Sequence, residues 1–228
     1  MSLVEPPRRL SDRTRELAAQ ALDGAWGRAL VDLPLSIEGR ADLAGASPWR
    51  RYAECVKVIA EQAPIRVLPG ERVVGAATLL KASQHATPVY EAAGKIAFPS
   101  ISHLTLGLDH ALAVGYRGLR QEVKDRLARG GLDEQGVELL KAMRICIDAA
   151  GAWQHRYLAL LDERVNASRG AEREAYVRAR ANLRTVPEHP PTTFGEAVQA
   201  LCLLFVFQRH CGNWPGIGRI DAMLGPYL

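Results

Sequence analysis

The chain has 228 residues, of which 48% are hydrophobic and 24% are charged, a balance that excludes a disordered protein. Its 29 Lys and Arg and 25 Asp and Glu residues give a net charge of +4 and are interspersed, which argues against a nucleic-acid-binding surface. The N-terminal sequence has no apolar signal segment, and no apolar run is long enough to cross a bilayer. The four cysteines show no Cys-x-x-Cys spacing, so we expect a cytoplasmic protein without disulfides or a zinc site.

The first third of the chain predicts two helices followed by two short strands. The first helix opens at Ser11 or Asp12, and its apolar residues repeat at intervals of three and four. The second helix opens at Ser47, an N-cap residue that is followed by Pro48 at the first helical position. Residues 64–75, PIRVLPGERVVG, then predict two strands around a Pro-Gly turn.

The middle of the chain changes from an irregular stretch to long helices. Residues 76–105 predict no regular element, since proline and glycine interrupt their short apolar runs, and such a stretch is either a functional loop or poorly ordered. Three helices follow, from Leu106 to Gly130, from about Asp133 to Ala167 and from Ala171 to about Leu183. Gly115 and Gly118 inside the first of them predict close helix packing.

A sixth helix begins at Thr193, which forms a capping-box pattern with Glu196. Apolar side chains occupy almost every face of this helix as far as Phe207, a pattern that predicts burial in a large core. A glycine-rich turn follows it and carries four polar or aromatic residues, Asn213, Trp214, Arg219 and Asp221. A buried helix that leads into such a turn is typical of a scaffold that presents a site.

Arg219 and Asp221 are the strongest candidates for a binding site. They alternate with Ile220, so an extended segment would point both side chains to the same side. The arginine can bind a carboxylate through two hydrogen bonds, and the aspartate can accept hydrogen bonds from a hydroxyl or face a cation. The spacing is equally compatible with a structural pair, in which the two side chains satisfy each other at the start of a strand.

The remaining candidate residues have structural interpretations. Cys211 ends the sixth helix, where the helix dipole disfavours a thiolate, so we interpret it as structural. His210 is its neighbour and points to another side of the helix end, which makes the two a poor pair of metal ligands. His85, His103 and His110 lack metal-ligand spacing and are expected to be surface or hydrogen-bonded histidines. We therefore predict no metal site and no catalytic residue in this chain.

Four motifs occur in an order shared with a known family. They are PIRVLPGERVVG, HALAVGYRGLRQEVKDRL, PEHPPTTFGEAVQAL and GNWPGIGRIDAMLGPYL. The first is similar to an early strand-turn-strand, the second to a helix with a G-x-x-G signature, and the last two to a Pro-rich entry, an apolar helix and a G-R-[IF]-D-x-x-L-x-P-Y turn. Together, from about Arg13 onward, they resemble the pyruvate formate-lyase-like (PFL) domain of the glycyl radical enzymes.

The resemblance implies a mainly α fold with a few short strands. Residues 1–228 would be the N-terminal part of one incomplete domain, comprising the helical layer and the first strand of a PFL-type α/β barrel. The implied activity is radical cleavage of a C–C, C–O or C–N bond in a small polar substrate, as in formate acetyltransferase or a glycerol- or choline-type lyase of anaerobic metabolism. The radical glycine and the cysteine that relays the radical belong to a later part of the domain. We therefore expect no cofactor bound to this chain.

The resemblance also implies partners and site residues. A separate activating enzyme, which uses S-adenosylmethionine and an iron–sulfur cluster, would install the radical. The G-R-x-D turn lies beside the substrate pocket in the family, so Arg219, Asp221, Asn213 and Trp214 would bind substrate. The sixth helix would be covered by barrel strands that this sequence lacks, so we expect the chain to expose apolar surface and form a homo-oligomer. Two alternatives stay open, namely a non-catalytic helical module that binds a full-length glycyl radical enzyme or its activating enzyme, and an unrelated helical protein.

Overall fold

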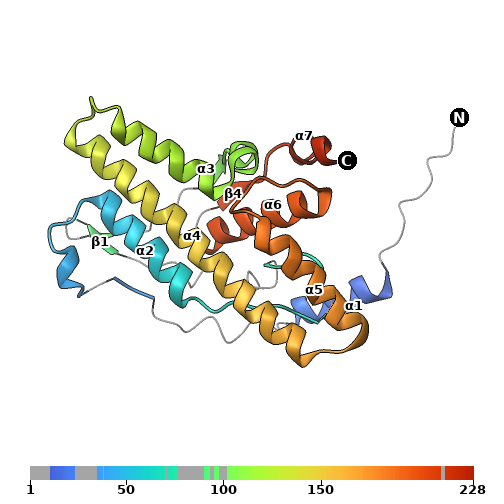
Figure 1. Cartoon of the computed structure of the whole chain (residues 1–228). Coiled ribbons are helices and arrows are strands. Elements are labelled where there is room, and N and C mark those ends of the chain that lie inside the picture. Colours follow the sequence, from blue (N-terminus) through green and yellow to red (C-terminus); the bar gives the residue numbers. More distant parts are fainter. Residues whose placement is uncertain are drawn as a thin grey trace, which may run out of the picture.

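The computed structural model describes residues 11–23, 35–37, 39–69, 71–75, 90–92, 95–97, 102–211 and 214–228. The long helix α4 (Glu134–Ala167) runs diagonally through the molecule, with α3 (Leu108–Ala128) on one side and α2 (Pro48–Gln62) on the other (Figure 1). Helix α5 (Gly170–Thr185) packs along the far end of α4, and α6 (Phe194–His210) packs on α3 and α5. The prediction of a mainly helical fold is confirmed.

The remaining helices are short. Helix α1 (Asp12–Leu22) lies near the N-terminus, and α7 (Ile220–Leu224) packs on α6 near the C-terminus (Figure 1). Among the described residues there are also two 3-10 turns, η2 (Ala41–Leu43) before α2 and η4 (Gly225–Tyr227) after α7.

Side-chain caps fix three of the predicted helix starts. Ser47 Oγ accepts a hydrogen bond from the Arg50 N–H at 3.2 Å, and an Asp133 carboxylate oxygen accepts one from the Gly136 N–H at 2.8 Å. Thr193 Oγ1 accepts one from the Glu196 N–H at 3.2 Å. Each bond satisfies a backbone donor that the first turn of a helix leaves without an intrahelical partner. The starts of α2, α4 and α6 predicted from the sequence are therefore confirmed.

The core lies where α4 meets α2, α3 and α6. Trp153 and Tyr157 of α4 are both 0% exposed, and their rings meet edge to face with centroids 4.9 Å apart. Trp153 also contacts Phe207 of α6 at a centroid distance of 5.1 Å. Such aromatic contacts bury a large apolar area in a fixed geometry, so they orient α6 against α4.

The burial of α6 corrects one expectation. Its apolar residues were predicted to depend on absent barrel strands for cover, yet Leu203 and Val206 are 0% and 2% exposed within this chain. Gly75 lies directly against Leu203 and Val206, and helices α3 and α5 and the ring of Trp153 pack on the rest of α6. The exposed apolar surface expected for α6 is thus smaller than predicted, although Phe194 at its start is 43% exposed, and homo-oligomer formation remains an untested prediction.

The strands predicted for residues 64–75 are wrong. Residues 64–69 and 71–75, the described part of this segment, run as irregular backbone with turns. The Val74 N–H donates to Gln199 Oε1 and the Val74 carbonyl accepts from Gln199 Nε2, both at 2.9 Å. The buried side-chain amide of α6 therefore takes the place of a neighbouring strand in satisfying this backbone.

Two small sheets occur in the described chain. Strands β1 (Tyr90–Ala92) and β2 (Lys95–Ala97) pair antiparallel, and β3 (Ser102–Thr105) pairs in parallel with β4 (Trp214–Gly216). Part of the stretch predicted to be irregular is thus strand, and the rest of residues 76–101 lies outside the described residues. The parallel pair joins segments more than a hundred residues apart in sequence, with α3 following β3 and α6 preceding β4.

Candidate functional site

The parallel β3–β4 pair positions the glycine-rich turn that the sequence singled out. β4 ends at Gly216, and residues 217–219 lead into α7. Gly218 has φ 85°, and a Cβ at this position would lie 2.9 Å from Cγ2 of Thr105 in β3. Only glycine fits this combination of a left-handed backbone and close contact, so the turn is held tightly against the strand.

Arg219 and Asp221 bind each other at the start of α7. Arg219 Nε donates to Asp221 Oδ1 at 2.8 Å and Arg219 Nη2 donates to Asp221 Oδ2 at 2.6 Å. Their hydrogen bonds raise the pKa of the arginine and lower the pKa of the aspartate. The side chains are 79% and 67% exposed, so this pair is available to solvent and not part of the core.

The geometry differs from the extended segment that the alternating pattern predicted. Ile220 begins a helix, and Arg219 is its N-cap residue. The two charged side chains meet because of this helical turn, as the structural-pair interpretation proposed, but at the surface. Of the other predicted substrate-binding residues, Asn213 lies outside the described residues. Trp214 is described only as backbone of β4.

A cavity of about 370 Å³ lies beside the same strand. Its wall is formed by α2, α3, α4 and α6, and by Pro215 of β4. The lining is apolar in the main and includes Val56, Ala111, Tyr116 and Cys146. Nothing in the sequence patterns predicted this cavity, since it forms between helices that are far apart in the chain.

The thiols near the cavity are protonated. Burial raises the pKa of Cys146 to about 12 and raises the pKa of Cys211 well above its ordinary value. Cys211 is 3% exposed, which agrees with its structural interpretation. A buried neutral thiol is a poor nucleophile, so neither side chain is suited to attack a substrate.

The histidines described by the structure do not form a metal site. His210 is 0% exposed and stacks on Trp153 at a centroid distance of 6.1 Å, while His110 pairs with Glu122 at the surface at 3.0 Å. Within the described residues, no group of three or more His, Cys, Asp or Glu side chains is arranged to hold a metal ion. The side chains of His85 and His103 lie outside the described part.

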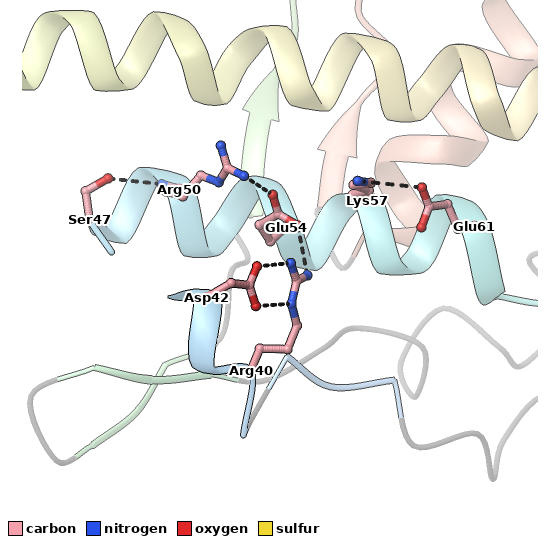
Figure 2. A network of polar contacts seen from close by, with 7 residues as sticks. All are labelled: Arg40, Asp42, Ser47, Arg50, Glu54, Lys57 and Glu61. Carbon is pink, nitrogen blue, oxygen red and sulfur yellow. Dashed lines mark hydrogen bonds and ion pairs between the residues drawn. The ribbon is translucent and has the colours of Figure 1, made fainter. Parts of the chain in front are cut away.

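A buried carboxylate in α2 is one of the polar features that sequence reasoning missed. Glu54 is 2% exposed and binds Arg40 Nη1 through Oε2 at 2.8 Å and Arg50 Nη2 through Oε1 at 2.7 Å (Figure 2). Arg40 also donates two hydrogen bonds to Asp42 of η2, from Nη2 to Oδ2 at 2.6 Å and from Nε to Oδ1 at 3.1 Å. The hydrogen bonds to Asp42 and Glu54 raise the pKa of the Arg40 guanidinium. The spacing of Arg50 and Glu54, four residues apart on a helix, was the available signal.

Figure 2 shows how this network joins two elements. Arg40 stands between Asp42 of η2 and Glu54 of α2, so the ion pairs hold the turn against the helix. Both oxygens of Glu54 are engaged by arginine, which leaves the carboxylate no free role as a base. We interpret the network as structural.

Comparison with known proteins assigns this architecture to a class. The glycerol-bound B12-independent glycerol dehydratase from Clostridium butyricum aligns with 99% of this chain and 37% of its own at a TM-score of 0.75 and 16% sequence identity. A glycyl radical enzyme from Archaeoglobus fulgidus aligns with 97% of this chain and 35% of its own, with a TM-score of 0.63 and 21% identity. The fold is therefore that of a part of the glycyl radical enzyme fold, a little more than a third of those chains.

Sequence comparison places the chain in a family. A model of the family described as pyruvate formate lyase-like matches residues 87–228, and the chain belongs to this family. It is 31% identical over 134 residues to the probable dehydratase YbiW of Escherichia coli K12, covering 55% of this chain and 16% of the relative. It is 32% identical over 130 residues to the isethionate sulfite-lyase of Oleidesulfovibrio alaskensis, covering 52% and 15%.

The chain thus spans about a sixth of the curated relatives it matches and little more than a third of the solved structures. None of the described helices has the length and apolar character needed to span a membrane.

Proposed function

We propose that this chain is the N-terminal part of a glycyl radical dehydratase or lyase of the cytoplasm and of anaerobic metabolism. The observation that carries the proposal is the family match over residues 87–228 together with a fold shared with glycyl radical enzymes over nearly the whole chain. Both curated relatives are named as a dehydratase or a lyase, which favours elimination from a small polar substrate over acyl transfer.

In this proposal the chain supplies structure and part of the substrate pocket. The exposed Arg219–Asp221 pair, with Asn213 and Trp214 before it, would face the substrate, and the arginine would donate to a polar group of it. The pair already satisfies itself, so binding a substrate would exchange an internal hydrogen bond for one to the ligand. Asp221 in this role suits a hydroxylated substrate, because a carboxylate accepts hydrogen bonds from hydroxyl groups.

The radical chemistry would come from outside these residues. A glycyl radical, installed by an S-adenosylmethionine and iron–sulfur activating enzyme, would supply hydrogen-atom abstraction through a relay cysteine. Cys146 and Cys211 do not fit the relay role, because burial raises the pKa of both side chains and holds them as neutral thiols. The glycine and the relay cysteine would therefore belong to a later segment of a longer protein.

A second candidate function is suggested by the burial of α6 residues against other parts of this chain. Leu203 and Val206 are buried within the described part of this chain, so these two residues need no further chain to cover them. That observation favours a self-contained helical module that binds a full-length glycyl radical enzyme or its activating enzyme.

The mass of the native protein separates the two candidates. An antibody raised against residues 1–228 should detect, in extract of anaerobically grown source cells, a polypeptide far larger than 24.9 kDa. Its reading frame should continue past Leu228 into a cysteine loop and a glycine loop. A native protein of 24.9 kDa with a stop codon at that point would contradict the enzyme and support the module.

A further inference from the structure

Another hollow, of about 770 Å³, lies between α1, the turn at residues 69–72 and α5. Each helix turns one face to it, because its lining residues recur at intervals of three and four. They include Arg13, Thr14 and Leu17 on α1 and Ala171, Ala175 and Arg178 on α5. The alanines of α5 are too short to fill the space opposite α1, so the space stays open.

Three arginines from separate parts of the sequence line this hollow. Arg13 donates to the Pro69 carbonyl at a long 3.4 Å, and Arg178 lies 3.7 Å from Glu174 with its side chain 71% exposed. Arg72 is exposed, and its side chain has no hydrogen bond or ion pair within the described residues. A guanidinium has five N–H donors, so most donors of these three side chains are open to a ligand.

Two carboxylates also line the hollow, but each is engaged within its own segment. Glu71 Oε2 accepts from the Leu68 N–H at 2.9 Å, and Glu172 Oε1 accepts from the Tyr176 hydroxyl at 3.1 Å. The charges of three arginines and two glutamates leave the described lining with a net charge of +1. The open hydrogen-bonding groups are thus mainly cationic donors, which suits an anion.

The lining narrows the class of anion. No aromatic ring is present among the described lining residues, so a nucleotide base has no surface on which to stack. Arginine binds phosphate and carboxylate groups through paired N–H donors. A single exposed ion pair contributes little, so an anion with one charged group gains only weak binding. An anion with several such groups can contact more than one of the three arginines at once.

We propose that this hollow binds a small anion that carries at least two phosphate or carboxylate groups. Arg72 and Arg178 hold the charged groups from the turn and from α5, and Arg13 approaches from α1. None of the described lining residues belongs to the Arg219–Asp221 turn, and binding requires no radical. The proposal therefore stands or falls independently of the proposed function.

The test is calorimetric titration of the 228-residue chain at low ionic strength with diphosphate, tricarballylate and orthophosphate. Diphosphate, tricarballylate or both should bind saturably at one site and more tightly than orthophosphate. The stronger of the two shows whether the site favours phosphate or carboxylate groups. Added salt should weaken the binding, because it screens exposed charges.

Substitutions locate the site. Arg72→Gln and Arg178→Gln should each weaken binding about three- to tenfold, the effect of one charge-assisted contact at an exposed position. Arg129→Gln is the matched control, because it removes the same charge from the exposed end of α3, at the opposite end of α4 from α5 (Figure 1). Ala175→Phe fills the hollow and should abolish binding.

Melting curves verify that each variant is folded. Three results would overturn the proposal. The wild-type chain could bind neither diphosphate nor tricarballylate, or it could bind orthophosphate as tightly as both. Alternatively, folded Arg72→Gln and Arg178→Gln could bind no more weakly than Arg129→Gln, which would reduce the effect to net charge.

Discussion

Gly115 lies against the backbone of Glu188, so closely that a Cβ on residue 115 would come within 2.6 Å of the Glu188 carbonyl oxygen. Gly115 interrupts α3 with φ 64° and ψ 175°, a region essentially restricted to glycine. The break directs two N–H groups out of the helix, and Tyr116 N donates to Pro187 O at 2.8 Å and Arg117 N to Glu188 O at 3.1 Å. This glycine therefore joins α3 to the segment that links α5 and α6.

Gly115→Ala should destabilise the chain strongly. The backbone conformation costs a non-glycine residue roughly 1–3 kcal/mol, and the clash with Glu188 adds about as much, so we expect a loss of roughly 2–6 kcal/mol. Chemical denaturation followed by circular dichroism measures it. Gly130→Ala is the matched control, because Gly130 has φ 68° but nothing within 4 Å of an added Cβ. A loss no greater than that of the control would show that the contact with Glu188 does not require glycine.

Glu54→Gln should also destabilise the chain, because it removes the charge that both Arg40 and Arg50 bind. The arginines are 34% and 42% exposed, so water compensates in part, and we expect about 1–3 kcal/mol rather than the loss for a fully buried pair. Glu61→Gln on the exposed face of the same helix should change stability by less than about 0.5 kcal/mol. Double-mutant cycles with Arg40→Met and Arg50→Met would give the two couplings, and zero coupling for both would contradict the network.

The buried side chain of His210 should make the stability of the chain depend on pH. Burial, assisted by the nearby charge of Arg156, lowers the pKa of His210 to about 4, whereas the unfolded chain has a histidine pKa of about 6.5. Between these values the unfolded state binds the proton more readily, so stability is full above about pH 6.5 and falls by up to about 3 kcal/mol as pH falls toward 4.

The measurement is the free energy of unfolding at pH 7 and pH 5. His210→Leu should flatten the profile in this window, while the exposed His110→Gln should retain it. Glu196 has a lowered pKa, so its loss of stability begins below the ordinary carboxylate pKa of about 4.3 and is separate from this window. An unchanged slope in the His210 variant would contradict the assignment.

Local signals predicted the helices well because each start is fixed by residues within one turn. Ser47, Asp133 and Thr193 cap α2, α4 and α6 as expected. The parallel β3–β4 pair was not predicted as such, since short parallel strands have no local signal and find each other only after the helices pack. The strands predicted for residues 64–75 fail for a related reason, because the backbone partner there is the side chain of Gln199.

The sequence also did not predict which polar residues are buried. Glu54, Gln154 and Gln199 are each 2% exposed or less, although their residue types predict the surface. Gln154 Nε2 donates to the Leu183 carbonyl at 2.7 Å and the Val186 carbonyl at 3.1 Å, so it completes the end of α5. Such roles depend on which backbone groups the tertiary fold brings within reach. The cavity beside Tyr116 and Gln208 arises in the same way.

Substitutions in the exposed Arg219–Asp221 pair should change catalytic activity but not the stability of the chain. In the 228-residue chain, Arg219→Gln and Asp221→Asn should leave the melting temperature unchanged, because both side chains are largely exposed. In a complete enzyme built on this sequence, each should lower kcat/KM about tenfold or more, the effect of losing one charge-assisted hydrogen bond to substrate. Unchanged kinetics in both variants would remove these residues from the substrate site.

Electron paramagnetic resonance on the complete polypeptide that contains this sequence, incubated anaerobically with its activating enzyme, tests the central claim most directly. We predict a glycyl radical signal that disappears when the radical glycine is replaced by alanine, and no signal from the 228-residue chain under the same conditions. A complete polypeptide that gives no radical with an activating enzyme proven active on another family member would contradict the assignment, as would a glycyl radical on the 228-residue chain alone.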